Sequence, residues 1–585
     1  MTNTGLKTVA INIDGSMFKR SGAWFGLFQR GSSYGDISLY LGTLHGISAK
    51  AAEKNKMIDV FPTFNGRKVP FTVKAVPSEL TLTTSHGDVR FTFADLTKLV
   101  AEGDPGMGLL FEKNMVRHES VHPRKGGAWE AVFRFSSCFI FKGLEGSTFD
   151  FNNGENYWNW ENLSSDKVCG RTHPGPDNRF TLVMEEFAYG GIVRDAYPTY
   201  LEARTSMQAD WEAFISKMPR FIEPFEHKRL ECEYTTWSFL QSPYGTARFP
   251  MIQMFAGITG SQWQMCQNAV ALQEHLALAV DMLLGPLDRI SAEGQLADGY
   301  DDAACETQMI KPPVHGWAIK QIMKNHDLIK ECPREKIEIL YTGIGAWGDW
   351  FMNYRDEDED GLPTFVHGDE TGLDDSTMFL DHIRITSPDL SAYLVILFEA
   401  VGDLAKLLMK PEAETNAWYE KSESLLKRLV DNLWDGEHFI GLVPDSGERV
   451  FSGSIVHYMP AILGSRLPRD IIDKMADDLS DKEKFLSPWG LASEDMTSDY
   501  FCPSPGSIGR GCVVPPAMIF ICTGLWETHR KNDARIFAEN YCNALSNSGF
   551  PFLINPQNGM GSGYFGGSWP RCAYEILGRM LSEDK

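Results

Sequence analysis

The sequence predicts a mainly α-helical protein in which an (α/α)6 barrel follows an N-terminal antiparallel β-sandwich. Up to about residue 200, short segments alternate apolar and polar residues between turn-forming residues. Beyond that point the segments are longer and carry apolar residues at helical spacing, separated by irregular loops rich in Gly and Asp. Helices that alternate with long polar loops are typical of an α/α barrel, whose loops at one end form a pocket. A helical array or bundle has the same periodicity and remains an alternative.

The length of 585 residues exceeds the size at which a single hydrophobic core usually stops growing. We therefore expect more than one domain. The change of pattern predicts a β-sandwich domain over residues 1–200, a helical linker over 201–240 and a barrel domain over 241–585.

Each β-like segment alternates with period two, which places one face of a strand toward a core. The clearest of these segments read DISLYLGTL, KVPFTVKAV, LTLTTSHGDVRFTF and AVFRFSSCFIF. Gly, Asn, Pro or Asp turns separate them, and this favours antiparallel neighbours in a sandwich.

The clearest helix pattern is SPDLSAYLVILFEAVGDLAKLLMK, residues 387–410. Ser387 can cap this helix and Pro388 suits its first turn, while apolar residues recur at steps of three and four. Further helical patterns are YPTYLEARTSMQADWEAFISKM, QWQMCQNAVALQEHLALAVDMLL, VHGWAIKQIMKNHDLI, NAWYEKSESLLKRLVDNLW, RDIIDKMADDLS, PPAMIFICTGLWETHR and DARIFAENYCNALSN.

Composition argues against several classes of partner. With 55 Lys and Arg against 78 Asp and Glu, the net charge of -23 repels nucleic acid and anionic membranes. The N-terminal residues lack a signal-peptide pattern and no apolar run reaches membrane-spanning length, so we expect a soluble, cytoplasmic protein. The 11 cysteines are scattered without a CxxC pair, which indicates neither a zinc site nor a disulfide framework.

The stretch VHGDETGLDDSTMF, residues 366–379, concentrates four carboxylates in a segment with few strong helix formers. With the residues before it, NYRDEDEDGLPTF, it resembles bacterial members of glycoside hydrolase family 63, including the mannosylglycerate hydrolase type, and more distantly trehalases. In that family an R-D-x-D-x-D-G-L run precedes an E-S-G-x-D-x-S motif, which corresponds here to residues 370–376. The segments KPPVHGWAI, DLSAYLVILFEAVGDLA, WGLASE and GRGCVVPPAMIFICTGL resemble further family segments in the same order, so the likeness covers roughly residues 250–580.

The resemblance implies an (α/α)6 barrel that acts on small α-glycosides with inversion, and it places the general acid at Asp374. This role is chemically reasonable because the nearby carboxylates of Glu370 and Asp375 disfavour ionisation of Asp374 and raise its pKa. Glu370 is accordingly a second catalytic candidate. The alternative is a solvated acidic loop.

The second carboxylate of an inverting pair, about 6.5–9.5 Å from the acid, is missing from its family position. The family places that Glu four residues before a Pro, and the matching segment FPFLINPQNGMGSGYFGGSWP has Phe552 there. A sugar-contacting Asp of the family's Q-W-D-x-x-F helix is likewise replaced by Gln264. Either another residue is the base, or the reaction is no longer ordinary hydrolysis.

Candidates for a relocated base are Glu494 and Asp495 in GLASEDMTSDYF, and Asp301 and Asp302 in LADGYDDAAC. For each of them, a structural role in a loop or turn is the alternative. His315 titrates near neutral pH and is a further candidate for proton transfer, or a structural residue at a helix start.

A sugar pocket in such a barrel is expected to combine aromatic rings with polar groups. Core packing is the alternative for each aromatic residue. The candidates for substrate binding are Trp263, Gln264, His315, Trp317, Trp347, Arg510, Phe552 and Trp569.

Asp356, Asp358 and Asp360 stand at alternate positions before a Gly in DEDEDGLPT, the oxygen-rich spacing of a calcium loop. No Glu stands at the closing position of an EF-hand, so the alternative is a charged turn that orients Arg355. A structural calcium ion is therefore a hypothesis, and no cofactor is expected for the reaction.

The first hypothesis is a glycosidase with Asp374 as proton donor, acting on a small carbohydrate. The second is a lyase, isomerase or cyclase on the same barrel, with Asp374 as proton donor in a drier pocket beside Phe552. The third is a sugar-binding homologue without activity. The sequence leaves open the substrate, its anomeric form and the oligomeric state.

Overall fold

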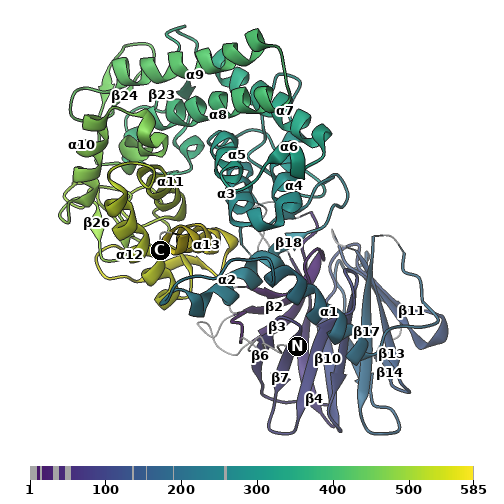
Figure 1. Cartoon of the computed structure of the whole chain (residues 1–585). Coiled ribbons are helices and arrows are strands. Elements are labelled where there is room, and N and C mark those ends of the chain that lie inside the picture. Colours follow the sequence, from purple (N-terminus) through teal and green to yellow (C-terminus); the bar gives the residue numbers. More distant parts are fainter. Residues whose placement is uncertain are drawn as a thin grey trace, which may run out of the picture.

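The structure is a computed structural model of the chain (Figure 1). It describes residues 10–13, 16–30, 38–46, 55–134, 137–152, 155–188, 190–255 and 260–583. Residues 36–37 and 135–136 of two predicted strand segments lie outside these ranges. Antiparallel sheets form the N-terminal part and helices form most of the C-terminal part, as the sequence predicted.

Among the described residues, two antiparallel sheets of eight and nine strands make up the N-terminal part. The first runs in the order β1-β2-β3-β4-β10-β16-β14, with β5 paired to β4. Its strands are β1 (Met17–Phe18), β2 (Phe25–Arg30), β3 (Ser38–Thr43), β4 (Lys56–Phe64), β5 (Arg67–Lys68), β10 (Met107–Asn114), β14 (Thr148–Phe151) and β16 (Lys167–His173). The second runs in the order β15-β11-β12-β13-β17-β9-β8-β7-β6. Its strands are β6 (Thr72–Val76), β7 (Glu79–Thr83), β8 (Asp88–Phe93), β9 (Lys98–Gly103), β11 (Ser120–Pro123), β12 (Trp129–Val132), β13 (Cys138–Leu144), β15 (Asn156–Tyr157) and β17 (Phe180–Phe187).

Aromatic side chains join the two sheets. The ring of Phe25 on β2 packs edge-on against Phe139 on β13 at 5.0 Å, and Phe111 on β10 meets Phe141 on β13 at 5.4 Å. All four side chains are buried. The period-two pattern therefore directs aromatic residues of both sheets into one shared core.

The helical part begins at Tyr200 and contains short hairpins between its helices. The helices are α1 (Tyr200–Ile215), α2 (Glu226–Phe239), α3 (Gln262–Ala271), α4 (Leu276–Leu287), α5 (His315–Met323), α6 (Leu328–Glu331), α7 (Arg334–Tyr354), α8 (Pro388–Leu407), α9 (Glu412–Leu433), α10 (Arg469–Ser480), α11 (Pro515–Leu525), α12 (Lys531–Ser548) and α13 (Ser568–Glu583). Short 3-10 segments are η2 (Lys125–Gly127) in the sandwich, η3 (Gln273–His275), η4 (Gly368–Thr371), η5 (Thr377–Phe379) and η6 (Ile455–Arg466). Strands β22 (Thr364–Phe365), β23 (Ile385–Thr386), β24 (Gly441–Leu442) and β25 (Arg449–Val450) form one sheet in that order. The others pair two by two: β18 (Leu240–Gln241) with β19 (Met251–Ile252), β20 (Gly299–Tyr300) with β21 (Cys305–Glu306), β26 (Leu486–Ser487) with β27 (Gly490–Leu491), and β28 (Pro551–Ile554) with β29 (Gly561–Phe565).

Two local expectations were wrong. The pattern over residues 262–284 forms two helices, α3 and α4, which meet at a bend of 92°. The break falls at η3, where His275 Nε2 hydrogen-bonds the backbone oxygen of Phe214 on α1 at 3.0 Å. The side chain of Ser387 makes no capping bond to the backbone of α8 and donates instead to the carboxylate of Asp389.

Among the described residues, no single helix is long and apolar enough to cross a membrane. The bent pair of segments Gln262–Ala271 and Gln273–Leu287 meets that requirement by length and composition only.

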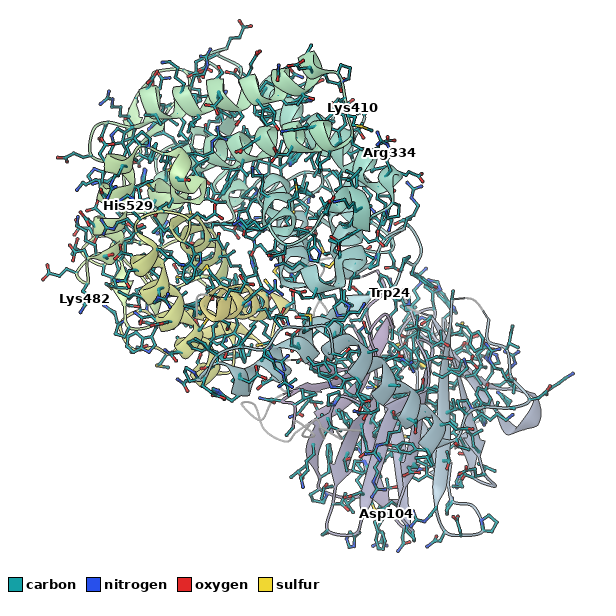
Figure 2. All side chains as sticks on the ribbon, in the orientation of Figure 1. Trp24, Asp104, Arg334, Lys410, Lys482 and His529 are labelled. Carbon is teal, nitrogen blue, oxygen red and sulfur yellow. The ribbon has the colours of Figure 1, made fainter. Side chains whose placement is uncertain are left out.

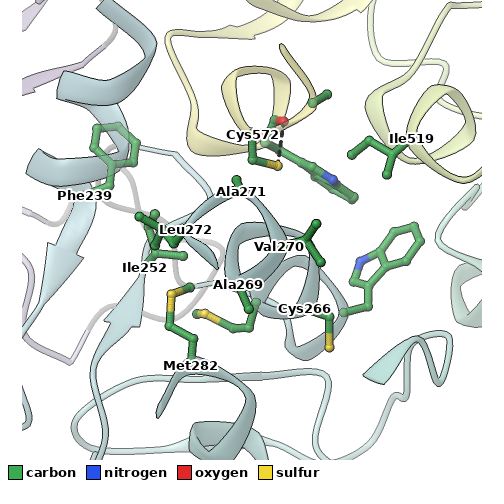
Figure 3. Close-up of a cluster of buried hydrophobic side chains, with 14 of the residues drawn as sticks. Phe239, Ile252, Cys266, Ala269, Val270, Ala271, Leu272, Met282, Ile519 and Cys572 are labelled. Carbon is green, nitrogen blue, oxygen red and sulfur yellow. Dashed lines mark hydrogen bonds between the residues drawn. The ribbon is translucent and has the colours of Figure 1, made fainter. Parts of the chain in front are cut away.

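Successive inner elements pack against one another: α3 on α5, α5 on α8, α8 on η6, η6 on α11, α11 on α13, and α13 on α3. Figure 3 shows part of the core between α3 and α13, where Ala271 and Val270 lie near Cys572. The loops that carry the family-like motifs precede the N-terminal ends of these elements. Neighbouring N-terminal ends therefore bring separate motifs of the sequence together.

Candidate active site

The acid-rich motif of residues 370–376 lies in the loop before α8 and is held by a buried ion pair. Glu370 accepts two hydrogen bonds from the Arg355 guanidinium, at 2.8 and 2.9 Å, and one from the backbone N–H of Val366 at 2.8 Å. Its carboxylate is thus fully used to hold the loop, because it is buried and bidentately paired. The structure places Glu370 as a support of the motif rather than facing a substrate.

Gly372 adopts φ 74°, in the left-handed region that favours glycine. A Cβ atom at this position would lie 2.3 Å from the indole of Trp263. The first turn of α3 therefore packs directly beneath the motif.

Asp374, the predicted acid, has a side chain that is 43% exposed and lies 3.2 Å from Lys311 Nζ through Oδ1. Lys311 also donates to the backbone oxygen of Asp369 at 2.5 Å. Loss of hydration raises the pKa of Asp374 above its ordinary value; Lys311 opposes this rise, and the carboxylates of Asp369 and Asp375 add to it. A raised pKa is what a proton donor requires.

The next carboxylate, Asp375, has a different role. Its Oδ1 accepts from the backbone N–H groups of Ile508 and Gly509 at 3.0 and 2.6 Å, and its Oδ2 accepts from the Ser507 hydroxyl at 2.9 Å. Arg510 donates through Nε to the backbone oxygen of Asp375 at 2.9 Å. Asp375 therefore anchors the loop before α11 to the acid loop and brings Arg510 beside the site.

Phe552 lies in an aromatic cluster that reaches the acid motif through Trp263. Its ring stacks on Trp569 at 5.3 Å and meets Phe255 at 5.4 Å, and Trp569 meets Trp263 at 5.1 Å. Phe552, Trp569 and Trp263 are all buried. The position predicted from the family alignment thus belongs to an apolar wall on the same side of the site as Gly372.

Gln264 is fully buried in α3 and donates through Nε2 to the Ser568 hydroxyl at 2.6 Å. This bond ties α3 to the start of α13. Its Oε1 has no hydrogen-bond partner among the described residues, so one polar atom is left for another group.

The four predicted replacements for the base fall in different surroundings. Glu494 is fully buried and accepts from Thr377 and Ser498 hydroxyls at 2.7 Å each, and burial raises its pKa. Asp495 caps a turn by accepting from the N–H and the hydroxyl of Thr497. These two carboxylates are therefore occupied within the loop.

Asp301 caps its own turn by accepting from the N–H groups of Ala303 and Ala304 at 2.7 and 2.8 Å. Asp302 instead binds the sandwich: His45 Nδ1 lies 2.8 Å from Oδ2 and the Gly46 N–H donates to Oδ1 at 2.8 Å. Both oxygens of Asp302 therefore bind groups of the sandwich, at the junction of the two parts. This role differs from the one predicted for Asp374.

The junction around Asp302 is an ionic and aromatic cluster. The ring of His45 lies between Asp302 and Glu186 and stacks on Trp24 at 5.0 Å. Trp24 lies where the sheets meet the helices (Figure 2). Burial alone would lower the pKa of His45, but hydrogen bonds to Asp302 and Glu186 raise it to about 9. A protonated His45 therefore joins the sandwich to the helical part at neutral pH.

Three other candidates lie in the helical core. His315 is fully buried, and burial lowers its pKa to about 4, so it is neutral near pH 7. Trp317 is buried against Phe520 and donates to the Thr523 hydroxyl at 3.2 Å. Trp347 is buried and stacks on Trp350 at 5.1 Å. These contacts place the three side chains in core packing.

The predicted metal loop brings its three carboxylates together. Ligand oxygens of Asp356, Asp358 and Asp360 lie within 4.8 Å of one another. Burial and mutual repulsion raise the pKa values of Asp356 and Asp360. A cation would relieve this repulsion, and oxygen-only ligands suit calcium.

Two charged residues beside Asp374 were missed at the sequence level. Lys311 begins the KPPVHGWAI segment, and Asp298 precedes the Asp301 turn by three residues. Gln262 at the start of α3 connects them: its N–H donates to the Asp298 backbone oxygen at 2.6 Å, and its Nε2 donates to the Lys311 backbone oxygen at 3.0 Å. In the sequence, the sign that could have indicated them is Lys311, a basic residue just before the predicted helix that begins in VHGWAIKQIM.

Comparison with known proteins shows what the chain is similar to. Residues 288–569 match the model of the mannosylglycerate hydrolase MGH1-like glycoside hydrolase domain. The matched region, 282 of the 585 residues, is therefore similar to a glycoside hydrolase domain. The domain is glycosidase-like and of the hydrolase class. No curated protein matches the chain.

Solved structures resemble the fold at low sequence identity. The GH63 mannosylglycerate hydrolase from Thermus thermophilus, in complex with glucose, has a TM-score of 0.51 and 18% identity, and the match covers 60% of this chain and 99% of that one. The same enzyme in complex with Tris and D-glycerate has a TM-score of 0.50 and 17% identity, and the match covers 60% of this chain and 99% of that one. A family GH92 α-mannosidase from Bacteroides thetaiotaomicron has a TM-score of 0.57 and 10% identity, covering 97% of this chain and 82% of that one. The last match includes the sandwich, so the N-terminal sheets and the helical part together resemble the fold of that α-mannosidase.

Proposed function

We propose that this protein hydrolyses a small α-glycoside with inversion of configuration, and that Asp374 is the general acid. The observation that carries the proposal is the position of Asp374: a part-exposed carboxyl with a raised pKa, in a loop held by Glu370 and Asp375. In the reaction Asp374 gives its proton to the glycosidic oxygen as the bond to C1 breaks. Water attacks C1 from the opposite face and loses its proton to a base.

The same proposal takes the helical part to be an (α/α)6 barrel. Six elements, α3, α5, α8, η6, α11 and α13, pack in a succession that returns to its start. Residues from α3 and from the loops before α5, α8 and α11 meet around the motif, which supports an active site at that end. Small carbohydrates are the proposed substrates because the mannosylglycerate hydrolase of similar fold was solved with glucose and with D-glycerate.

A second candidate function is a non-hydrolytic reaction, namely elimination, isomerisation or cyclisation, with Asp374 as proton donor. The observation that favours it is the aromatic wall of Phe552, Trp569 and Phe255 at the position where the family carries its base. An apolar wall excludes the water that hydrolysis consumes.

A panel of α-glucosides and α-mannosides distinguishes these functions. We expect the parent to release reducing sugar from at least one member, and Asp374→Asn to abolish the release. A parent that is inert on the panel but converts a non-glycosidic substrate in an Asp374-dependent way would exclude the hydrolase. A parent that binds sugars without converting any of them would identify a sugar-binding homologue.

Lys311 is expected to set the pH range of the reaction. Its ammonium group favours the ionised form of Asp374, so Lys311→Met should raise the pKa of Asp374 further. A general acid is active only while protonated, and the fall in kcat/KM at high pH should therefore move to higher pH. The control is Lys421→Met, which removes an exposed pair with Asp349 on the outer helices. A basic limb that stays in place in Lys311→Met would contradict this role of Lys311.

We propose a structural calcium ion in the loop of Asp356, Asp358 and Asp360. Chelation by EGTA should then lower the melting temperature and added calcium should restore it, because the ion stabilises only the native state. Asp358→Asn should lose most of this response. Equal melting temperatures with EGTA and with calcium would leave the loop as a charged turn.

A further inference from the structure

The hydrolytic reaction proposed above needs a second carboxylate, and its family position holds Phe552. The described part of the chain offers several carboxylates near the acid motif, and their hydrogen bonds decide which of them is free. Glu370 and Asp375 are used by Arg355 and by the loop before α11. Glu494 and Asp302 are used by hydroxyl groups and by His45.

Two other carboxylates, those of Asp389 and Asp369, are not placed to act as the general base. Asp389 is buried as a whole residue at the start of α8, where the Ser387 hydroxyl donates to it. Asp369 lies on η4, five residues before Asp374 in the same loop, and its carboxylate faces His367 at 3.4 Å. An inverting base must approach the sugar from the face opposite the acid, and therefore from another element.

Asp298 meets these conditions. It comes from the segment before β20, which is remote in sequence from the acid loop, and its side chain is only partly buried. Its Oδ1 is buried and has no hydrogen-bond partner among the described residues. The backbone of Asp298 is fixed on both sides, because its oxygen accepts from the N–H of Gln262 at 2.6 Å and its N–H donates to the oxygen of Glu306 at 2.9 Å. A carboxylate on a rigid backbone with unused acceptor capacity is suited to bind and activate water.

Lys311 links Asp298 to the acid. The Lys311 ammonium interacts with both the Asp374 and the Asp298 carboxylates, and the two carboxylates also repel each other. Burial raises the pKa of Asp298, while Lys311 and the nearby Ser261 hydroxyl oppose the rise. Repulsion between the two carboxylates favours a state with one proton on the pair, in which one carboxyl is an acid and the other is a base.

We infer that Asp298 is the general base of this site, replacing the glutamate whose family position is occupied by Phe552. The inference rests on the proposed hydrolytic function. In the reaction Asp298 takes a proton from water, the water oxygen forms the new bond to C1, and the C1–O bond breaks as Asp374 protonates the leaving oxygen. One water and one glycoside give two hydroxyl products, after which Asp298 returns its proton to solvent and Asp374 regains one.

The dependence of kcat on the leaving group distinguishes the general acid from the general base. The substrates are an α-glycoside with an alkyl leaving group and the matching α-glycosyl fluoride, because fluoride departs with little protonation. Asp374→Asn should lose more than about a hundredfold of kcat on the alkyl glycoside and much less on the fluoride. Asp298→Asn should lose more than about a hundredfold on both, since water must still be activated.

Azide tests the same assignment chemically. Azide needs no base, so it should restore turnover of the α-glycosyl fluoride by Asp298→Ala, with a β-glycosyl azide as product and fluoride released. The control variant is Glu293→Gln, an exposed carboxylate in the same segment, which should behave as the parent. All variants are compared by melting temperature.

Parent-like kcat in a folded Asp298→Asn would overturn the inference and leave the hydrolase proposal intact. A loss confined to the alkyl glycoside would also overturn it, because Asp298 would then act only through Asp374. Absence of hydrolysis by the parent itself would overturn the proposed function, and with it this assignment.

Discussion

Asp374→Asn is expected to lower kcat on an unactivated α-glycoside by more than about a hundredfold, the usual contribution of a general acid. The substitution removes the transferable proton and keeps the size of the side chain. It also exchanges the ion pair with Lys311 for a weaker hydrogen bond. Because the Asp374 side chain is 43% exposed, we expect only a small change in the free energy of unfolding.

The measurement is kcat by reducing-sugar release, together with a thermal melt of each variant. Asp431→Asn is the matched control, since Asp431 is an exposed carboxylate on α9 that pairs with Lys427. It should retain the parent kcat. A folded Asp374→Asn with parent activity would remove Asp374 from the mechanism.

Phe552→Glu is expected to lower the melting temperature without raising the rate of hydrolysis. The substitution removes a ring that stacks on Trp569 and places a carboxyl group in a buried, apolar wall. Large truncations of buried Phe cost about 3–5 kcal/mol, and the desolvated carboxyl adds to this cost. If Asp298 already activates water, a second carboxylate near the water site perturbs the reaction and creates no new one.

Phe552→Gln is the control for Phe552→Glu, because it removes the ring without adding a charge. Both variants should be destabilised, Phe552→Glu more than Phe552→Gln because of its carboxyl group, and neither should exceed the parent in hydrolysis. Slow cleavage of an α-glycoside by Phe552→Glu, with none by the parent or by Phe552→Gln, would support the non-hydrolytic function for the parent.

Much of the architecture follows from periodicity. Alternation predicted the antiparallel sheets, and the three- and four-residue steps predicted α8 to within a few residues. The bend between α3 and α4 was not predicted, since it depends on His275 meeting the backbone of α1. Local patterns give each segment its periodicity, whereas contacts between distant segments decide where a helix breaks.

The candidate site follows from the sequence only in part. The motif order led to Asp374, and the structure adds the loop supports that make its position specific. Asp298 was missed because its proposed role depends on Lys311, thirteen positions later, and on the hydrogen bonds that occupy the other carboxylates. Asp302, in the same segment, was predicted as a candidate base, but in the structure it pairs with His45 of the sandwich. Which carboxylate is free is a property of tertiary contacts and is absent from any single segment.

The central claim, inverting hydrolysis by this site, is tested most directly by the anomeric configuration of the first product. Proton NMR of the parent acting on an α-glycoside in D2O follows the anomeric signals before mutarotation. The account predicts that the β-anomer appears first and that Asp374→Asn yields neither anomer at a comparable rate. Initial appearance of the α-anomer, or Asp374-dependent turnover with no sugar released from any α-glycoside, would contradict it.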